Sequence, residues 1–140
     1  MADPGKSIRT YLQTKSTVTD VTSTRMYPDH LPQNATLPAM TYAVVSTNGP
    51  QHMTASAGWS DVRVQLDCYA ATYAAAQNLA EQIRLVMHGY AGAMGSDKVD
   101  VVQLANGFSS YDDPLDGSDK GRHVYVLEWR LWVAETIPNI

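Results

Sequence analysis

The stretch 61-DVRVQLDCYAATYAAAQNLAEQIRLVMHG-89 decides the fold class, because it reads as a strand that runs directly into a helix. In its first part, over Asp61–Ala71, apolar and polar residues alternate strictly. This pattern predicts a strand with one packed face and one polar face. The packed positions are Val62, Val64, Leu66 and Cys68, and the polar positions are Arg63, Gln65, Asp67 and Tyr69.

The second part predicts a helix from about Tyr73 to His88, with Thr72 as its N-cap and Gly89 at its end. Its apolar residues recur at the spacing that places them on one stripe of a helix. Each large side chain buried along this stripe contributes about 1.5–3 kcal/mol. The stripe consists of Ala76, Leu79, Ala80, Ile83, Val86 and Met87.

A shorter helix is predicted near the start of the chain. Ser7 is a suitable N-cap, and apolar residues recur at helical spacing up to about Ser16. The following segment, Thr17–Thr24, is rich in Thr and Val. Stiff β-branched side chains and competing hydroxyl groups disfavour a helix there, so the first helix is expected to end before it.

Three further stretches have the composition of strands. Met40–Ser46 is expected to be buried on both faces, and Lys98–Asn106 precedes an acidic turn region at 109–121. Arg122–Ala134 is expected to be a long last strand with two different faces. One face carries Tyr125, Leu127, Trp129, Leu131 and Val133, and the other carries Glu128, Arg130 and Trp132.

The predicted element order is α-β-β-α-β-β, which indicates a single α+β domain over residues 1–140. Strands joined by loops favour an antiparallel sheet, here four-stranded or slightly larger, with two helices packed on one face. The segment 47–61 is polar and contains glycine, with Trp59 near its end. We expect this segment to protrude as an arm.

The stretch 25-RMYPDHLPQNATLPAMTYAVVS-46 reaches its strand through three prolines. Proline fixes its own φ and pushes the preceding residue towards extended conformations. It also lacks an N–H donor, so the segment resists pairing as a sheet edge. Tyr27–Ala39 is therefore expected to be extended, stiff and without β-pairing. It would carry the chain across the domain, and the alternative is that it also lies at a subunit boundary.

Composition limits the classes of function. Hydrophobic residues make up 44% and charged residues 17% of the chain, which is typical of a folded domain. The net charge is −4 and the basic residues are scattered, so tight binding to a phosphate backbone is disfavoured. No apolar run approaches the about 18 residues needed to cross a bilayer, and the N-terminus lacks a signal-peptide pattern. We expect a protein made and kept in a cytoplasm.

No residue pattern indicates a catalytic, cofactor or metal site. The lone cysteine, Cys68, lies on an apolar strand face and is expected to be a core residue. The glycine loop 89–96 follows a helix instead of preceding one, and the acidic loop 111–121 lacks the closing Glu of a calcium loop. The histidines, which lack metal-ligand spacing, are His30, His52, His88 and His123. We therefore expect no enzyme, no cofactor and no bound metal.

Three pieces of the sequence occur in a characteristic order. They are 25-RMYPDHLPQNATLPAMTYAVVS-46, the strand VRVQLDCYAATY running into the helix AAAQNLAEQIRLVM, and the closing strand YVLEWRLWV after SSYDDP. As an ordered set they resemble the tail-completion or tail-terminator family of long-tailed bacteriophages and phage-like particles. The resemblance covers roughly residues 5–135 and departs mainly in 47–61.

The resemblance implies a structural virion protein of the tail or neck, assembled in the host cytoplasm. Such proteins form a ring, usually a hexamer, that caps the finished tail tube and ends its polymerisation. The ring offers a joining surface to the head-side connector or stopper protein. The implied partners are therefore other copies of the chain, the tail tube protein and the connector. DNA passes through the ring without specific binding, and no membrane is involved.

In a ring, polar residues of the sheet would be candidates for contact with a neighbouring subunit or the tail tube. The candidates are Tyr27, Trp59, Arg63, Gln65, Asp67, Glu128 and Arg130. For each of them the alternative is a solvated sheet face. Two other functions stay open, namely another neck or head-completion ring protein and, more remotely, a small-molecule-binding α+β domain.

Overall fold

The described part of the chain comprises residues 3–32, 35–48, 59–95, 97–112 and 121–134 of a computed structural model. Its helices are α1 (Pro4–Gln13), α2 (Ser16–Thr22) and α3 (Tyr73–Met87). Its strands are β1 (Met26–Pro28), β2 (Ala39–Asn48), β3 (Trp59–Ala70), β4 (Gly92–Met94), β5 (Asp97–Asp112) and β6 (Arg122–Ala134).

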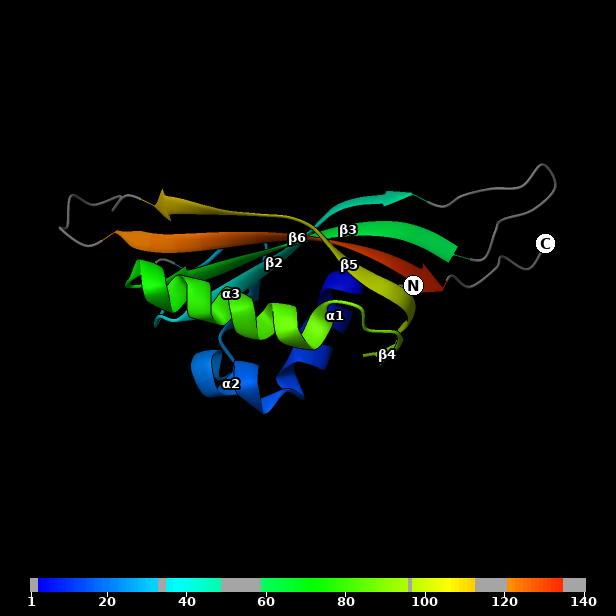
Figure 1. Ribbon diagram of the computed structural model, residues 1–140, viewed down its shortest axis with the longest axis horizontal. Helices are drawn as coiled ribbons and strands as arrows, with labels where there is room; N and C mark the ends of the chain where they lie inside the picture. Colours follow the sequence, from blue (N-terminus) through cyan, green and yellow to red (C-terminus); the bar gives the residue numbers. More distant parts are fainter. Residues whose placement is uncertain (1–2, 33–34, 49–58, 96, 113–120, 135–140) are drawn as a thin grey trace.

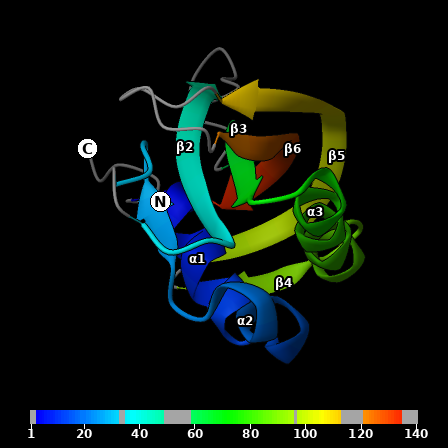
Figure 2. The same cartoon turned by 90° about the vertical axis from the view of Figure 1, so that its left-hand side faces the viewer.

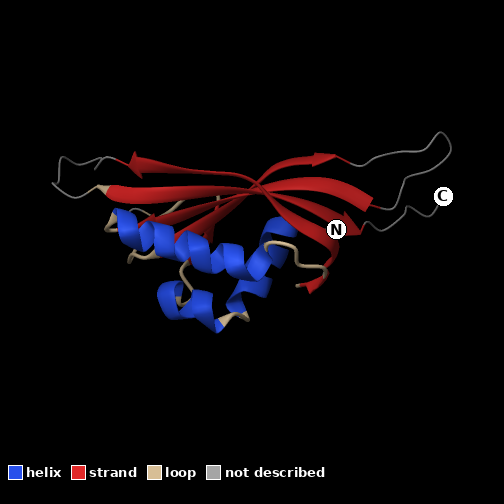
Figure 3. Ribbon diagram, in the orientation of Figure 1, coloured by secondary structure: helices blue, strands red, loops and turns tan. Residues whose placement is uncertain are grey.

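The strands form one six-stranded sheet in the order β1-β2-β3-β6-β5-β4. Neighbouring strands are antiparallel except β1 and β2, which run parallel. The helices lie on one side of the sheet (Figures 1 and 3), and a view turned by 90° shows its curl (Figure 2). The α+β class and the one-sided helix layer are confirmed. The predicted order was incomplete, because it missed α2, β1 and β4.

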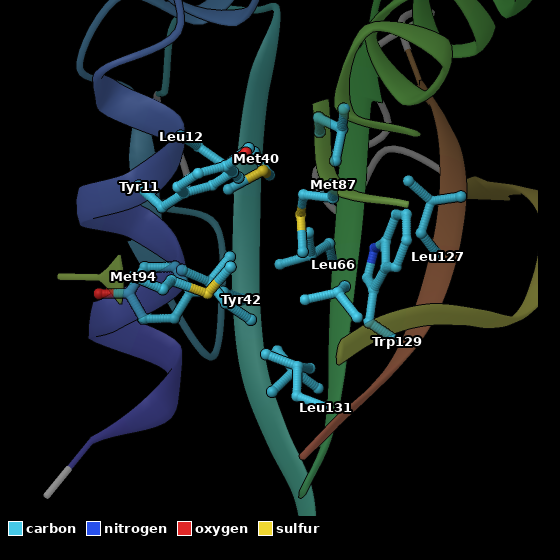
Figure 4. Close-up of a cluster of buried hydrophobic side chains, with 14 of the residues drawn as sticks. Tyr11, Leu12, Met40, Tyr42, Leu66, Met87, Met94, Leu127, Trp129 and Leu131 are labelled. Carbon is cyan, nitrogen blue, oxygen red and sulfur yellow. The ribbon is translucent and has the colours of Figure 1, made fainter. Parts of the chain in front are cut away.

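The central pair, β3 and β6, builds the core. The predicted packed face of β3 is confirmed, since its four apolar side chains are fully buried. Val64 lies opposite Trp129. Leu12 of α1 and Met87 of α3 reach the same cluster from the helix layer (Figure 4). The alternation in the sequence therefore correctly predicts which face of β3 packs in the core, and the opposite face is left for other contacts. The buried side chains of β3 are Val62, Val64, Leu66 and Cys68.

The first helix begins earlier than predicted. Asp3 is its N-cap, because its carboxylate accepts the Lys6 N–H at 3.1 Å, and Pro4 takes the first helical position. Proline is well suited to that position since its missing N–H has no partner there in any helix. Ser7, predicted as the N-cap, lies inside the helix and is buried. Its hydroxyl instead donates to Asp97 Oδ2 at 2.6 Å, which joins α1 to the start of β5.

Replacing Ser7 with alanine is expected to destabilise the fold by about 1–3 kcal/mol, because it removes the hydroxyl donor of a buried carboxylate. Asp97 is only 9% exposed, so water cannot readily replace the lost donor. Chemical denaturation of Ser7→Ala measures the change. Thr10→Ala is the control, because its hydroxyl bonds only to the Lys6 carbonyl within the same helix. Equal stability of Ser7→Ala and the unmodified chain would contradict the role given to this hydrogen bond.

The segment Thr17–Thr24 is not free of helix, so that prediction was wrong. Ser16–Thr22 forms α2, a single short helix in which Val18 is fully buried. Its Lys15 N-cap makes no side-chain capping bond. Packing of Val18 and Thr22 therefore outweighs the weak local propensity, as is common for helices in proteins.

The prediction of an unpaired proline segment was wrong at its start. Met26–Pro28 forms β1, which pairs in parallel with Met40–Tyr42 of β2. Parallel neighbours need a connection that returns the chain to the same end of the sheet. The segment after Pro28 supplies this return. It is fixed at Arg25, whose Nε donates to the Pro38 carbonyl at 2.9 Å and whose carbonyl accepts the Met40 N–H at 3.0 Å.

Two other strands differ from their predicted bounds. β2 extends to Asn48 and contains a register shift between Val44 and Ser46, and Val45 is 58% exposed, so burial on both faces was wrong there. β5 continues to Asp112, beyond the predicted end at Asn106. The acidic turn predicted at 109–121 therefore begins as strand, and its residues 113–120 lie outside the described residues, as does most of the predicted arm.

Cys68 is expected to resist thiol reagents in the native protein. Its side chain is fully buried, and this burial raises the pKa of the thiol far above its usual value, so the reactive thiolate is absent. Maleimide labelling followed by mass measurement should give no adduct under native conditions and complete labelling in denaturant. Rapid labelling of the folded protein would contradict the placement of Cys68 in the core.

Candidate functional site: the polar face of the sheet

The helices cover one side of the sheet (Figure 1), and the polar residues that alternate with the buried positions of β3 face the other side. Register places the polar positions of β3 next to those of β6. Asp61 lies opposite Trp132, Arg63 opposite Arg130, and Gln65 opposite Glu128. The structure therefore brings together five of the seven residues predicted as contacts, and we call this surface the polar face. Those five residues are Arg63, Gln65, Asp67, Glu128 and Arg130.

Arg130 is held by its own chain. Its Nε donates to Asp61 Oδ1 at 3.0 Å and its Nη2 donates to Asp61 Oδ2 at 2.9 Å, a two-point ion pair. The guanidinium carbon also lies 5.5 Å from the centre of the Trp132 ring. Planar guanidinium groups suit both interactions. The Arg130 side chain therefore links β6 to β3 within one subunit.

Asp67 is also partnered within the chain. It accepts a hydrogen bond from Gln65 Nε2 at 2.9 Å. Burial raises the pKa of the Asp67 carboxyl above its usual value, and hydrogen bonds from Gln65 and Tyr69 oppose this rise. The Tyr69 ring in turn lies 5.3 Å from the Arg122 guanidinium carbon. This end of the polar face is thus a connected set of side chains.

Arg63 and Glu128 differ from their neighbours. Within the described residues, no hydrogen bond or ion pair of either side chain is present. Arg63 is exposed and stands directly opposite another cation, Arg130, which is an unfavourable arrangement in an isolated sheet. These two side chains are the charges of the polar face that are available to a partner.

The remaining two predicted residues lie elsewhere. Tyr27 is on β1, the strand at one end of the sheet, and is partly buried. Trp59 is the first residue of β3, and its side chain lies outside the described residues. Neither is brought next to Arg63 or Glu128 by the register of the strands.

The histidines of the described segments are spread over the structure. His30 and His88 are exposed, and His88 Nδ1 accepts the Leu104 N–H at 3.3 Å. His123 makes edge-to-face ring contacts with Tyr73 and Tyr111. His52 lies outside the described residues. Across the described segments, no three His, Cys, Asp or Glu side chains gather as a metal site would require. In these same segments, no helix is long and apolar enough to span a membrane.

Comparison with known families decides the class of the protein. Residues 6–134 match the family described as "Tail completion protein gp17". The chain belongs to this tail completion family. The match spans nearly the whole chain, including all the described strands and the polar face. Membership identifies a structural protein of the tail or neck of a virion, with a role in tail assembly, as the resemblance implied.

A solved structure supports the fold of this tail completion protein. It is a chain from "Virion of native gene transfer agent (GTA) particle", with a TM-score of 0.63 and 12% sequence identity, covering 89% of each chain. At this identity the likeness concerns the fold alone. A comparison with curated proteins gives no match.

Sequence reasoning missed one surface feature. Large apolar side chains are exposed on β2, at two positions predicted to be buried, and on β5, at two positions beyond the predicted end of the strand at Asn106. They are Val44, Val45, Phe108 and Tyr111. The stretch 105-ANGFSSYD-112 has no proline to stop a strand, but its Asn106-Gly107 pair favours a turn, so the sequence carried no clear signal that β5 continues.

Proposed function

We propose that this tail completion protein forms a ring, a hexamer, on the end of the finished tail tube. The ring ends tube polymerisation and presents a joining surface to the head-side connector. The single observation that carries this proposal is the family match over residues 6–134. The protein acts by assembly and not by catalysis, with the tail tube protein, the connector and other copies of itself as partners.

The charges of the polar face support a role in assembly. Arg63 and Glu128 carry opposite signs, lie on adjacent strands and have no side-chain partner within the described residues. Subunits that meet through two different surfaces form a ring when the rotation between them closes. The net charge of −4 also suits a channel for DNA, because a cationic lining would hold phosphate groups.

Tube growth gives a direct test of termination. Tail tube protein is polymerised alone and in the presence of the purified chain, and tube lengths are measured by electron microscopy. We expect growth to stop when the chain is added in small molar amounts relative to the tube protein. Unchanged lengths, together with binding to purified connector, would favour the alternative of a neck or head-completion ring.

Reversing the charge of Arg63 is expected to weaken ring formation and to leave the monomer folded, because a glutamate here replaces a like-charge pair with Arg130 by an opposite-charge pair. An exposed substitution changes the free energy of unfolding by about 0.5 kcal/mol or less. In an interface, a like-charge contact is strongly unfavourable, so Arg63→Glu should lower the affinity for tube ends about 10-fold or more. Lys98→Glu is the matched control, since Lys98 is an exposed cation at the start of β5. Equal capping by both variants would exclude Arg63 from the interface.

A further inference from the structure

Each outer strand of the sheet covers only part of its neighbour. β1 pairs with Met40–Tyr42 of β2, and β4 pairs with Asp97–Val99 of β5. The chain after α3 satisfies two further groups of β5, because the Val102 N–H donates to the Tyr90 carbonyl and the Val102 carbonyl accepts the Gly89 N–H. Beyond these points, β2 continues over residues 43–48 and β5 over residues 105–112. No described segment pairs with the outer edge of either stretch. We call these stretches the β2 free edge and the β5 free edge.

The strand register determines which backbone N–H and C=O groups of β5 point away from β6. The Leu104 N–H bonds to His88, on the side away from β6, and Leu104 lies opposite Trp129. The N–H and C=O of Trp129 therefore point to β3, and so do those of every second residue before it on β6. The β5 residues opposite these positions direct their own N–H and C=O to the free edge. They are Gly107, Ser109 and Tyr111.

The register also determines which backbone groups of β2 point away from β3. The Tyr42 carbonyl accepts the Asp29 N–H, so Tyr42 points away from β3, and it lies opposite Leu66. Every second residue of β3 before Leu66 shares its orientation. These β3 residues are Val64 and Val62. The β2 residues opposite them lie on either side of the register shift and direct their own N–H and C=O groups to the free edge. They are Val44 and Thr47.

Each free edge contains a register shift, at Val44/Ser46 in β2 and at Leu104/Asn106 in β5, but neither has charged residues along its length or a proline to block pairing. Natural edge strands carry charged residues, especially Lys, or proline, which prevent another strand from adding. Residues 43-AVVSTN-48 contain no charge and no proline, and 105-ANGFSSYD-112 carries a single charge at its end. Four of the six large apolar side chains exposed in the described segments also lie here, namely Val44, Val45, Phe108 and Tyr111.

The two free edges lie at opposite ends of the sheet. In Figure 1 the cyan end of β2 points to one end of the molecule and the yellow end of β5 to the other. β2 and β5 run in opposite directions, since each step from β2 through β3 and β6 to β5 is antiparallel. Copies in the same orientation would therefore place β5 of one antiparallel to β2 of the next.

We propose that the β5 free edge of one copy pairs with the β2 free edge of the next, so that the sheet continues from subunit to subunit. This inference rests on the proposed ring and identifies the contact that closes it. The contact is head-to-tail, because it joins two different edges. The opposite positions of the two edges also require neighbouring copies to be offset along their strands. A closed ring therefore has strands tilted from the ring axis, as in a barrel.

Proline variants separate edge pairing from folding. Ser109→Pro removes an N–H that points to the free edge, and the pairing of β5 with β6 does not use it. Thr47→Pro does the same on β2. Ser109→Thr and Thr47→Val keep the N–H and are the matched controls. We expect the controls to form rings in solution or on tube ends. Each proline variant alone should stay a folded monomer by circular dichroism and native mass spectrometry, with at least a 10-fold loss of ring formation.

Mixing the two proline variants tests the head-to-tail order. Ser109→Pro keeps an intact β2 free edge, and Thr47→Pro keeps an intact β5 free edge. The mixture should give one-to-one dimers and nothing larger, whereas each variant alone gives none. Rings formed by either proline variant, or dimers of one variant alone, would overturn the proposal. If the unmodified chain forms no rings, even on tube ends, the proposed ring itself is refuted. This result does not depend on the variants, so it can be told apart from a failure of edge pairing.

Discussion

A Trp129→Ala protein is expected to lose about 3–5 kcal/mol of its free energy of unfolding, the cost of emptying a buried aromatic site. Trp129 is fully buried, lies on β6 at the centre of the sheet, and packs in the cluster that joins α1 and α3 to the strands (Figure 4). A domain of this size has a total stability of about 5–15 kcal/mol. Urea denaturation followed by circular dichroism measures the loss.

Trp132→Ala is the matched control, because Trp132 is on the same strand but points to the polar face and is only partly buried. It should cost much less. Trp129→Phe should also cost less than Trp129→Ala. It retains most of the volume and removes the indole N–H, which is buried without a hydrogen-bond partner in the described structure. Similar losses for Trp129→Ala and Trp132→Ala would contradict the assignment of the two faces.

Shortening the segment between β2 and β3 is expected to abolish tube capping and to spare the fold. We propose that this arm docks onto a neighbouring subunit or the tail tube. β2 and β3 are antiparallel up to the pair Asn48 and Asp61, so Asn-Gly in place of residues 49–58 gives a four-residue connection together with Trp59 and Ser60. Circular dichroism and thermal unfolding check the fold, and tube-length measurement checks capping.

The equivalent change at the other end of the sheet is the control. β5 and β6 are also antiparallel neighbours up to Asp112 and Arg122, and a short turn can replace residues 113–120. This variant should fold and still cap tubes. Normal capping by the chain without residues 49–58 would rule out a docking role for the arm.

Long, strongly patterned elements could be predicted from the sequence. The alternation in β3 correctly placed Val62 and Cys68 in the core, and the stripe of α3 correctly began after the Thr72 cap, whose hydroxyl accepts the Ala75 N–H at 3.2 Å. In such elements, side-chain burial and backbone geometry favour the same structure, so local reasoning suffices.

Short elements could not be predicted because tertiary contacts form them. α2 depends on burial of Val18, and β1 exists only through its pairing with Met40–Tyr42, which is distant in sequence. The Asp3–Pro4 start of α1 was present in the sequence, but Ser7 offered an equally good cap by residue type. The hydrogen bond from the buried Ser7 hydroxyl to Asp97 shows that Ser7 lies inside the helix and that Asp3 is the cap, and this bond is a tertiary contact.

The polar face could be predicted only in part. Strand alternation placed Arg63 and Glu128 on it, but which charges are already paired depends on the register. Arg130 of β6 lies opposite Arg63 of β3 and bonds to Asp61, two residues before Arg63 on β3, a contact that spacing alone does not reveal. The free edges depend on where β1 and β4 stop, which is likewise a property of the folded sheet.

Imaging of tube ends shows whether this protein terminates the tail tube. Tail tubes assembled without the protein are mixed with the purified chain and examined by negative-stain electron microscopy. We expect rings seated on tube ends and tubes that no longer lengthen when more tube protein is added. Well-folded protein that leaves tube ends bare and growing would contradict this role.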